Sequence, residues 1–234
     1  MRWAKFTGEH DCPMTDYRKL RVDYRGQTLN ETNLATNPLV QFQEWIAAAT
    51  EAELPEPNAM TVATADVDGQ PSARHVLLKE VTTQGFVFYT NYASRKGREL
   101  EVNPKASLVF PWFAIFRQVI VIGSVTKVSR EESAAYFHSR PHESQLAAFA
   151  SDQSATLKSR ESLENRFEEL KTQYPEGSTV PLPENWGGYL VSPKTIEFWS
   201  GRSSRMHDRL VYTALNSNPD LSNSADWKIT RLSP

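Results

Sequence analysis

Ser94, Arg95 and Lys96 open a segment, residues 94–102, that has the sequence of a short helix. A serine at the N-cap bonds one of the free backbone N–H groups of the first turn, and the helix dipole makes this end electropositive. Two cations beside such an end favour a phosphate ligand. The alternative is an ordinary solvated helix start that happens to carry basic residues.

Arg74 and Lys79 flank an apolar run that reads as a strand. A spacing of five puts them on opposite faces of a regular strand, about 17 Å apart at about 3.3 Å per residue. They can hold one small group only if the strand bends, and otherwise they serve different phosphates or different parts of a long ligand. The alternative is a half-exposed edge strand whose long side chains reach water.

Tyr136, Arg140 and Ser144 lie around the helix break that Pro141 imposes. Tyr136 and Arg140 are four residues apart and share a helical face, and Ser144 follows at the next helix start. Their hydroxyl and guanidinium donors together suit a phosphate group.

A metal site is the competing interpretation of the same region, through His138 and His142. Pro141 disrupts their common helical face, and no carboxylate pattern accompanies them, so we expect no metal. The single cysteine, Cys12, excludes an internal disulfide and a Cys-rich zinc site.

A second candidate site is the segment of residues 205–209, in which every second residue is Arg205, His207 or Arg209. In an extended segment these three side chains point to one side and Asp208 points to the other. Such groups repel one another unless an anion lies among them, and a histidine can handle protons near neutral pH. A polar strand edge would tolerate the same pattern.

Composition limits the class of protein. The chain has 234 residues, a net charge of −2 and 39% hydrophobic residues, which is typical of a soluble globular protein with no field that attracts nucleic acid. We find no run of 18 apolar residues for a membrane span and no apolar signal core after the N-terminus. The expected location is therefore cytoplasmic.

Short strands with helices between them would position these residues. Residues 59–65, 72–81 and 86–92 form a predicted β-meander with turns between its strands. Further strands are predicted at residues 106–112, 118–128, 188–199, 209–213 and 227–232, with a possible bulge at Gly123. Helices are predicted at residues 17–24, from 37 onward, and at 94–102, 129–139, 143–149 and 160–174. Six or more antiparallel strands with helices between them predict a mainly β fold, a barrel with attached helices.

Taken in order, these motifs resemble the pyridoxine/pyridoxamine 5'-phosphate oxidase family from about residue 15 to the C-terminus. The matching stretches are residues 21–24, 58–60, 74–79, 88–91, 94–97, 110–112, 117–119, 136–141, 144–145, 153–154, 186–188, 197–199, 205–209, 227–229 and 231–234. The combination is far more specific than any single stretch.

The resemblance implies a homodimeric FMN-binding split β-barrel with FMN at the subunit interface. Residues 1–36 would be an N-terminal arm and substrate lid, and residues 37–234 the FMN-binding domain. The implied reaction oxidises pyridoxine 5'-phosphate or pyridoxamine 5'-phosphate to pyridoxal 5'-phosphate, with O2 as acceptor and H2O2 as product. No nucleic acid, membrane or metal is implied as a partner.

The resemblance also implies residue roles. From one subunit, FMN would be held by Arg74, His75, Val76, Leu77, Leu78, Lys79, Tyr89, Thr90, Arg95 and Lys96. From the other subunit, it would be held by Gln118, Gln153, Ser154, Trp199 and Arg209. The substrate phosphate would be bound by Lys79, Tyr136, Arg140 and Ser144. Arg205 and His207 would cover the pyridine ring as the catalytic pair, with Arg21 and Tyr24 as a lid.

Four positions depart from the family pattern, namely Val22, Phe116, Ser200 and Met206. None of them removes a residue with an implied ligand role. Two alternative functions remain: another flavin oxidase of the same fold, such as a phenazine-pathway enzyme, and a non-enzymatic protein that binds flavin or pyridoxal phosphate.

Overall fold

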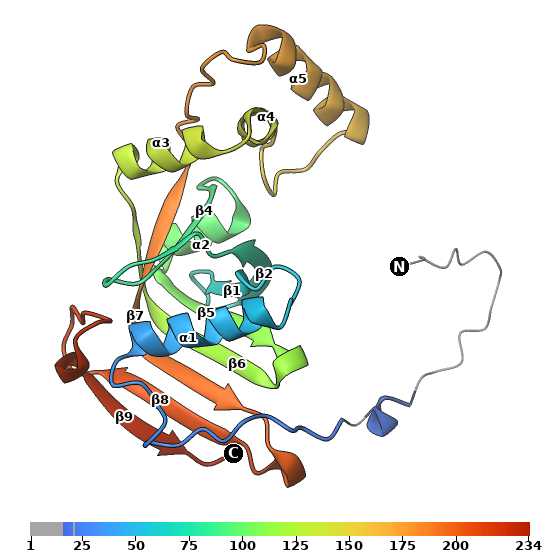
Figure 1. Ribbon diagram of the computed structural model, residues 1–234. Coiled ribbons are helices and arrows are strands. Elements are labelled where there is room, and N and C mark those ends of the chain that lie inside the picture. Colours follow the sequence, from blue (N-terminus) through green and yellow to red (C-terminus); the bar gives the residue numbers. More distant parts are fainter. Residues whose placement is uncertain (1–15, 21) are drawn as a thin grey trace.

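The computed structural model describes residues 16–20 and 22–234, and in this part of the chain one antiparallel sheet has nine strands (Figure 1). The strands are β1 Ala59–Ala65, β2 Pro71–Leu77, β3 Glu80–Val81, β4 Phe86–Asn91, β5 Lys105–Trp112, β6 Arg117–Lys127, β7 Trp186–Ser200, β8 Asp208–Ala214 and β9 Trp227–Leu232. Their order is β2-β1-β5-β6-β7-β4-β3, and β8 pairs with β7 and β9. The mainly β prediction is confirmed.

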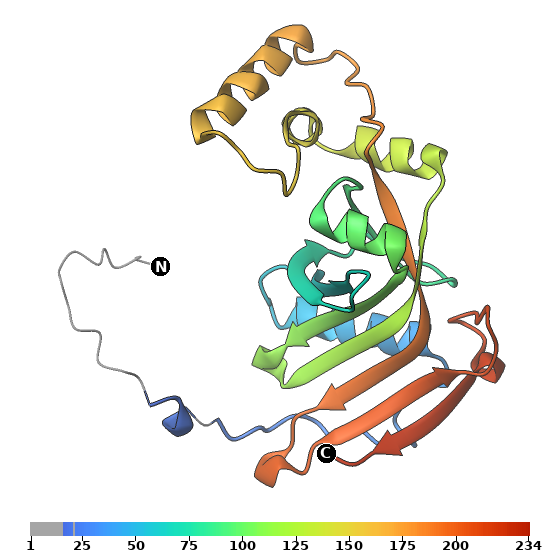
Figure 2. The same cartoon turned by 180° about the vertical axis from the view of Figure 1, so that it is seen from behind.

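Strand β7 is the long central strand that joins the two ends of the molecule (Figure 2). Its first part, up to Val191, pairs with β4, and its second part, from Thr195, pairs with β8. The change of partner coincides with a register shift opposite Gly123, where a Cβ atom would lie 2.1 Å from the Ser192 carbonyl oxygen. The predicted bulge is therefore present, and it lets one strand serve two parts of the sheet.

Five α-helices lie in the described part of the chain: α1 Pro38–Glu51, α2 Arg95–Val102, α3 Arg130–Ser139, α4 His142–Ala150 and α5 Arg160–Gln173. Their starts follow ordinary capping chemistry. The Asn37 side chain accepts from Val40 N–H ahead of Pro38, and Ser129 forms a capping box with Glu132. Short 3₁₀ turns complete the fold at Tyr17–Lys19, Phe113–Ile115, Ser203–Arg205 and Ser224–Asp226.

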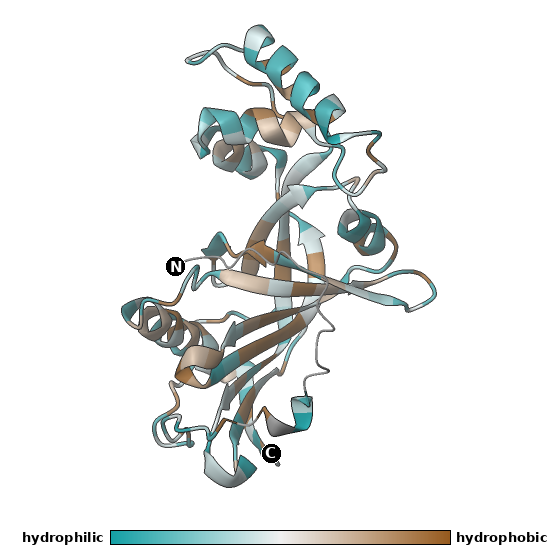
Figure 3. Cartoon of the chain, turned by 90° about the vertical axis from the view of Figure 1, so that its right-hand side faces the viewer, coloured by the Kyte–Doolittle hydropathy of each residue, from teal (hydrophilic) through white to brown (hydrophobic). Residues whose placement is uncertain are grey.

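The main hydrophobic core lies between helix α1 and the inner face of the sheet. Hydrophobic residues are frequent along the strands of this part of the sheet (Figure 3). Phe42 of α1 is 1% exposed and packs edge-on against Phe86 and Phe110, and Trp45 packs against Phe198. Such close aromatic packing fixes α1 on the barrel. We call this group of buried residues the barrel core.

A second, smaller core holds helices α3, α4 and α5 together at the other end of β7 (Figure 1). Phe137, Leu146 and Leu170 contribute from the three helices, and Trp186 contributes from β7. We call this group the helical core. The molecule therefore has two hydrophobic centres that meet along β4 and β7.

Three predicted elements differ from the structure. The strand predicted at residues 72–81 is two strands, because the chain leaves β1 after Leu77 and joins β4 at Glu80. The helix predicted at residues 17–24 is a single 3₁₀ turn, Tyr17–Lys19. The extended segment predicted around Arg205 is also a 3₁₀ turn, and β8 begins only at Asp208.

Candidate functional site

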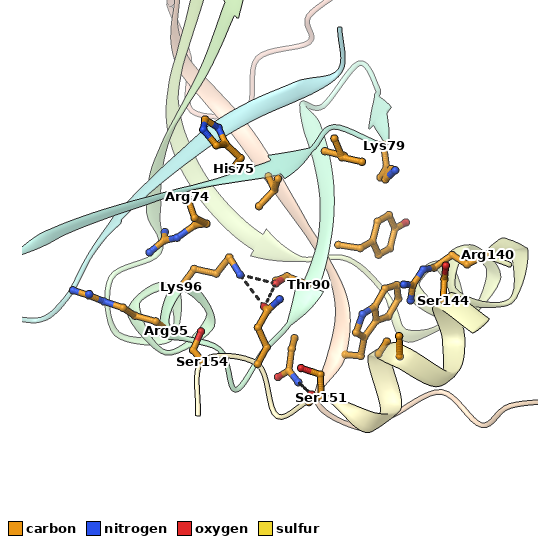
Figure 4. Close-up of a pocket in the computed structure, with 18 of the residues that line it drawn as sticks. Arg74, His75, Lys79, Thr90, Arg95, Lys96, Arg140, Ser144, Ser151 and Ser154 are labelled. Atoms are coloured by element: carbon orange, nitrogen blue, oxygen red, sulfur yellow. Dashed lines mark hydrogen bonds between the residues drawn. The ribbon is translucent and has the colours of Figure 1, made fainter. Parts of the chain in front are cut away.

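A pocket of about 920 Å³ opens where the barrel core and the helical core meet. It is lined by β2, by the strand β4, by the first turn of α2, and by helices α3 and α4 (Figure 4). Its lining includes Ser72, Arg74, His75, Val76, Leu77, Lys79, Tyr89, Thr90, Asn91, Arg95, Lys96, Tyr136, Arg140, Ser144, Ser151, Gln153, Ser154 and Trp186. Most residues predicted for flavin and substrate phosphate therefore lie in one cavity of a single chain.

One wall of the pocket carries Arg74, Arg95 and Lys96, which we call the α2 cation group (Figure 4). Lys96 is 6% exposed, and its ammonium donates to Thr90 Oγ1 and Gln153 Oε1, both at 2.9 Å. Burial, together with the charge of Arg74, lowers the pKa of Lys96 to about 8. A buried cation with this pKa favours an anion beside it, so the group fits a phosphate.

The opposite wall carries Arg140 and Ser144 with Tyr136 and Lys79, which we call the α3–α4 donor group (Figure 4). The Arg140 guanidinium lies 5.0 Å from the Trp186 ring, and burial lowers its pKa. Its Nη1 atom is buried and has no hydrogen-bond partner among the described residues. An unpaired buried donor is costly, so this nitrogen also fits an anionic ligand.

Arg74 and Lys79 reach different walls of the pocket because the strand breaks between them. Leu78 is buried, and its N–H donates to Asn58 O at 2.9 Å, whereas Lys79 N–H donates to Val87 O at 2.9 Å. The chain thus crosses from the edge of β1 to the edge of β4 within two residues. The strand therefore bends between Arg74 and Lys79, yet the two side chains lie on different walls of the pocket and do not converge on one point.

Three stacked rings, Tyr89, Tyr136 and Trp186, also line the pocket. Tyr89 stacks on Tyr136 with ring centroids 4.0 Å apart, and on Trp186 at 5.5 Å. Burial raises the pKa of Tyr89 to about 12, so its hydroxyl stays protonated at neutral pH. The Tyr89 hydroxyl is therefore a neutral hydrogen-bonding group on the pocket surface.

The resemblance assigned no role to Trp186, although it lines the pocket. The sequence signal was the Gly187-Gly188 pair that follows it. A Cβ atom on Gly187 would lie 2.2 Å from the Tyr92 hydroxyl, and one on Gly188 would lie 2.8 Å from the Tyr89 ring. The two glycines let the aromatic rings approach the strand.

Gln153 and Ser154 line the pocket of their own chain. Gln153 accepts hydrogen bonds from Thr90 Oγ1 and Lys96 Nζ of that chain, at 3.0 and 2.9 Å. The assignment of these two residues to a second subunit stays a prediction, and in the single chain they lie beside Thr90 and Lys96. The segment after α4 folds back over α2, which the sequence pattern could not indicate.

Gln118, Trp199 and Arg209 lie outside the pocket, as neighbours across three strands. Gln118 pairs with Trp199 across β6 and β7, and Trp199 pairs with Arg209 across β7 and β8. Arg209 donates to both carboxylate oxygens of Glu197, at 2.8 and 2.9 Å. This row lies at the opposite end of β7 from Trp186.

Trp199, His207 and Tyr24 form a cluster at this end, which we call the ring cluster. The His207 ring lies 4.8 Å from Trp199 and 5.4 Å from Tyr24. Arg202 N–H donates to His207 Nδ1 at 3.0 Å, so a neutral His207 ring carries its proton on Nε2. The backbone N–H of Arg202 therefore fixes the orientation of the His207 ring.

The predicted alignment of Arg205, His207 and Arg209 on one side of an extended segment is wrong. Ser204 and Arg205 have φ angles of 55° and 62°, so the backbone turns before it enters β8. Arg205 instead lines a separate cavity of about 250 Å³, together with Leu20, Val22, Asp23 and Tyr24. Alternation holds only in extended backbone, and the turn cancels it.

The N-terminal segment after residue 24 is fastened to the sheet beside the ring cluster. Gly26 N–H donates to Gly201 O at 2.8 Å, and Ser200 Oγ donates to Gln27 O at 2.6 Å. Phe116, another departure from the family pattern, packs edge-on against Tyr24 at 5.7 Å. Arg21, the other expected lid residue, lies outside the described residues.

Within residues 16–20 and 22–234, no group of three or more His, Cys, Asp or Glu side chains could hold a metal ion. In the same ranges, no helix has both the length and the apolar character that a membrane crossing requires.

Two family models match the chain. Residues 46–174 match the model described as pyridoxamine 5'-phosphate oxidase, and residues 186–234 match the pyridoxine 5'-phosphate oxidase C-terminal dimerisation region. The chain belongs to the pyridoxine/pyridoxamine 5'-phosphate oxidase family. The predicted family membership is confirmed.

Relatives in this family match over nearly full length. The pyridoxine/pyridoxamine 5'-phosphate oxidase of Streptomyces avermitilis is 51% identical and is aligned over 95% of this chain and 98% of its own. The enzyme of that name from Nostoc sp. is 54% identical, covering 92% and 97%. The one from Acidothermus cellulolyticus is 50% identical over the whole of both chains.

Solved structures support the fold. PhzG from Burkholderia lata 383, in complex with tetrahydrophenazine-1-carboxylic acid, has a TM-score of 0.79 at 30% identity, covering 89% of this chain and 99% of its own. A pyridoxamine 5'-phosphate oxidase-related, FMN binding protein from Nostoc punctiforme has a TM-score of 0.66 at 17% identity, covering 89% and 100%. The predicted split-barrel fold is confirmed.

Proposed function

We propose that this protein is an FMN-dependent oxidase that converts pyridoxine 5'-phosphate or pyridoxamine 5'-phosphate to pyridoxal 5'-phosphate. The observation that carries the proposal is a single pocket with two separate anion-binding walls. The α2 cation group would bind the phosphate of FMN, and the α3–α4 donor group would bind the phosphate of the substrate. Relatives at 50–54% identity carry the name of this activity.

When bound, FMN supplies the electron-accepting chemistry that amino-acid side chains lack. For the alcohol substrate, C4′ loses a hydride equivalent and its hydroxyl loses a proton, and O2 takes up two electrons and two protons to give H2O2. Arg74, Arg95 and Lys96 would fix the cofactor, while Lys79, Arg140 and Ser144 would fix the substrate beside it. Catalysis would depend mainly on this positioning.

A second copy of the chain would complete the site. In such a dimer, the cofactor of one chain would be contacted by Gln118, Trp199 and Arg209 of the other chain, and its substrate ring by Arg205 and His207 of that other chain. These residues lie in or near the region that matches the family's dimerisation model, apart from Gln118, which pairs with Trp199. With its proton on Nε2, a neutral His207 would donate a hydrogen bond to the substrate.

The outer face of the sheet supports a homodimer. Val109, Ile120, Glu197 and Val211 lie in register across β5, β6, β7 and β8, on the face opposite the barrel core. Within one chain Val211 is already buried and Val109, Ile120 and Glu197 are half-buried, so a second copy would cover the part of this mainly apolar row that is still open to water. A second copy on this face would bring one chain's ring cluster towards the other's pocket.

The phenazine alternative has a structural relative, because PhzG shares the fold at 30% identity. The α3–α4 donor group favours the phosphate substrate, because Arg140 offers a buried unpaired nitrogen beside Ser144. The non-enzymatic alternative keeps both ligand groups but shows no turnover.

Oxygen consumption by the FMN-loaded protein tests the proposal. We expect uptake of O2 and formation of H2O2 with pyridoxamine 5'-phosphate, and much weaker turnover of pyridoxamine, which lacks the phosphate. Equal rates for both compounds would contradict the assignment of the α3–α4 donor group. FMN binding without any oxygen uptake would favour the non-enzymatic alternative.

A further inference from the structure

Glu99 lies behind the α2 cation group, on the second turn of the same helix. Its side chain is 6% exposed, and four side chains donate to its carboxylate. Arg95 Nε donates to Oε1 at 2.8 Å, and Arg74 Nη2 lies 3.4 Å from Oε2. Thr64 and Ser72 add hydroxyl donors at 2.5 and 2.6 Å.

This carboxylate is ionised at neutral pH. Burial by itself would raise the pKa of Glu99, but the hydrogen bonds from Ser72, Thr64 and Arg95 and the charge of Arg74 lower it to about 2. A buried anion therefore stands close to a site that is otherwise built for anions. By charge alone, Glu99 repels a phosphate ligand.

Glu99 does not line the pocket, whereas Arg74 and Arg95 do. It binds Arg95 through Nε, which leaves both terminal amino groups of Arg95 without a partner among the described residues. The Arg95 side chain is 56% exposed, so without this contact it would move among many rotamers. Glu99 thus holds both arginines from behind. The terminal amino groups of Arg95 stay available for a ligand, whereas those of Arg74 are also held by Val62 O, Thr64 Oγ1 and Ser72 Oγ.

We propose that Glu99 is a positioning residue for the phosphate of the flavin: it orients Arg95 and Arg74 and so strengthens anion binding despite its own negative charge. The inference rests on the proposed function, because it takes the phosphate of FMN as the ligand of the α2 cation group. A held guanidinium loses less freedom on binding, and this preorganisation increases affinity.

The positioning role and the charge effect predict opposite changes in FMN affinity when Glu99 is replaced by glutamine. If Glu99 acted only through its charge, Glu99→Gln would tighten FMN binding, because a repulsive charge is removed. If Glu99 positions the arginines, Glu99→Gln should weaken FMN binding, because the amide cannot accept from both arginines at once. The direction of the change therefore decides between them.

Fluorescence titration of the flavin-free protein with FMN and with riboflavin measures this direction. Riboflavin carries the same ring system without the phosphate, so the ratio of the two affinities isolates the phosphate contribution. We expect Glu99→Gln to weaken FMN by about tenfold, as for a lost charge-assisted contact, and to leave riboflavin within about twofold. Glu101→Gln is the matched control, because Glu101 is on the same helix, exposed, and paired with Lys127 at 2.8 Å.

A second variant, Glu99→Asp, keeps the inference testable if Glu99→Gln does not fold. Glu99→Asp keeps the charge but shortens the side chain, so it should also weaken FMN if the carboxylate acts by position and leave FMN unchanged if it acts by charge. FMN affinity that is unchanged or higher in whichever of the two variants folds would overturn the inference. Equal affinity of the unmodified protein for FMN and riboflavin would instead overturn the proposed flavin-phosphate site itself.

Discussion

Trp186 and Trp199 lie on the same strand, β7, yet they belong to different groups of site residues. Trp186 lines the large pocket and stacks on Tyr89, whereas Trp199 packs against Tyr24 and His207. At about 3.3 Å per residue, a straight strand would hold them about 40 Å apart. In one chain the ring cluster and the pocket therefore lie towards opposite ends of β7, and the proposed site combines one chain's pocket with its partner's ring cluster.

Mixed dimers test this arrangement by subunit complementation. One chain would carry Arg95→Ala with Lys96→Ala, and the other would carry Arg209→Ala with His207→Ala. Each variant alone should bind FMN weakly or turn over slowly, whereas co-refolded chains should regain about a quarter of wild-type activity, because half the dimers are mixed and each has one intact site. Activity is measured as oxygen uptake.

The control for the first chain is Arg98→Ala, which removes an exposed cation from the same helix. It should keep FMN binding, whereas the Arg95 and Lys96 double variant should lose more than about tenfold. No recovery in the mixture, with both parents folded and dimeric, would contradict a site shared between subunits.

Lys96 predicts a pH dependence of flavin binding. Its pKa in the ligand-free protein, about 8, is below the ordinary value of 10.5, so between these values it loses its proton in the folded chain and keeps it in the unfolded chain. FMN affinity should therefore fall as pH rises above 8, while this residue's contribution to the stability of the ligand-free protein rises with pH over the same window. Titrations with FMN and riboflavin, and chemical unfolding at each pH, measure the two effects.

Lys96→Met is the matched variant for this prediction, because it keeps the length of the side chain without the charge. Both pH effects should be reduced in it. An FMN affinity that falls equally in the variant and the wild type between pH 8 and 10 would show that another group controls the dependence.

Arg140 should control the affinity for the substrate phosphate. We expect Arg140→Gln to raise KM for pyridoxamine 5'-phosphate by more than about tenfold, because a charge-assisted contact is lost, while FMN binding is unchanged. Arg160→Gln on α5 serves as the control, since Arg160 is exposed and pairs with Glu164. Steady-state kinetics in which both variants keep a wild-type KM would remove Arg140 from the site.

Arg205 and His207 should act on turnover rather than on flavin binding. We expect Arg205→Lys to raise KM and lower kcat, because lysine lacks the planar group that stacks on a ring. His207→Ala should lower kcat/KM by roughly 10²-fold if the ring handles or stabilises a proton. The affinity for FMN should be unchanged in both variants. A wild-type kcat/KM in both variants would show that Arg205 and His207 have a structural and not a catalytic role.

The sequence predicted the strands well because their apolar residues alternate and their turns contain Gly, Asp and Asn. The bulge at Gly123 and the capping box at Ser129 were also predictable, since each depends on local residues. The break after Leu77 was not, because it depends on Asn58 and Val87, which are distant in sequence. The turn at Ser203–Arg205 was missed because its φ angles occur at residues other than glycine.

For the candidate site, too, the residues in local motifs were predictable, and those that depend on distant parts of the chain were not. Arg95 with Lys96, and Tyr136 with Arg140 and Ser144, were predicted from short local motifs, whereas the family resemblance added Arg74 and Lys79 to these two groups. The position of Gln153 over Lys96 could not be predicted, because it depends on how residues 151–159 return across α2. Glu99 was also missed, since its role depends on Thr64 and Ser72 from two other strands.

The division into a barrel core and a helical core has a consequence for how the pocket can diverge. Arg95 and Lys96 belong to α2, which packs against the barrel core. Tyr136, Arg140 and Ser144 belong to α3 and α4 or to the break between them, and these helices pack in the helical core. Substitutions that reshape α3 and α4 can alter one wall while the cavity's other wall keeps its support. The fold is therefore modular: a lineage, or an engineer, can exchange the substrate and retain the cofactor.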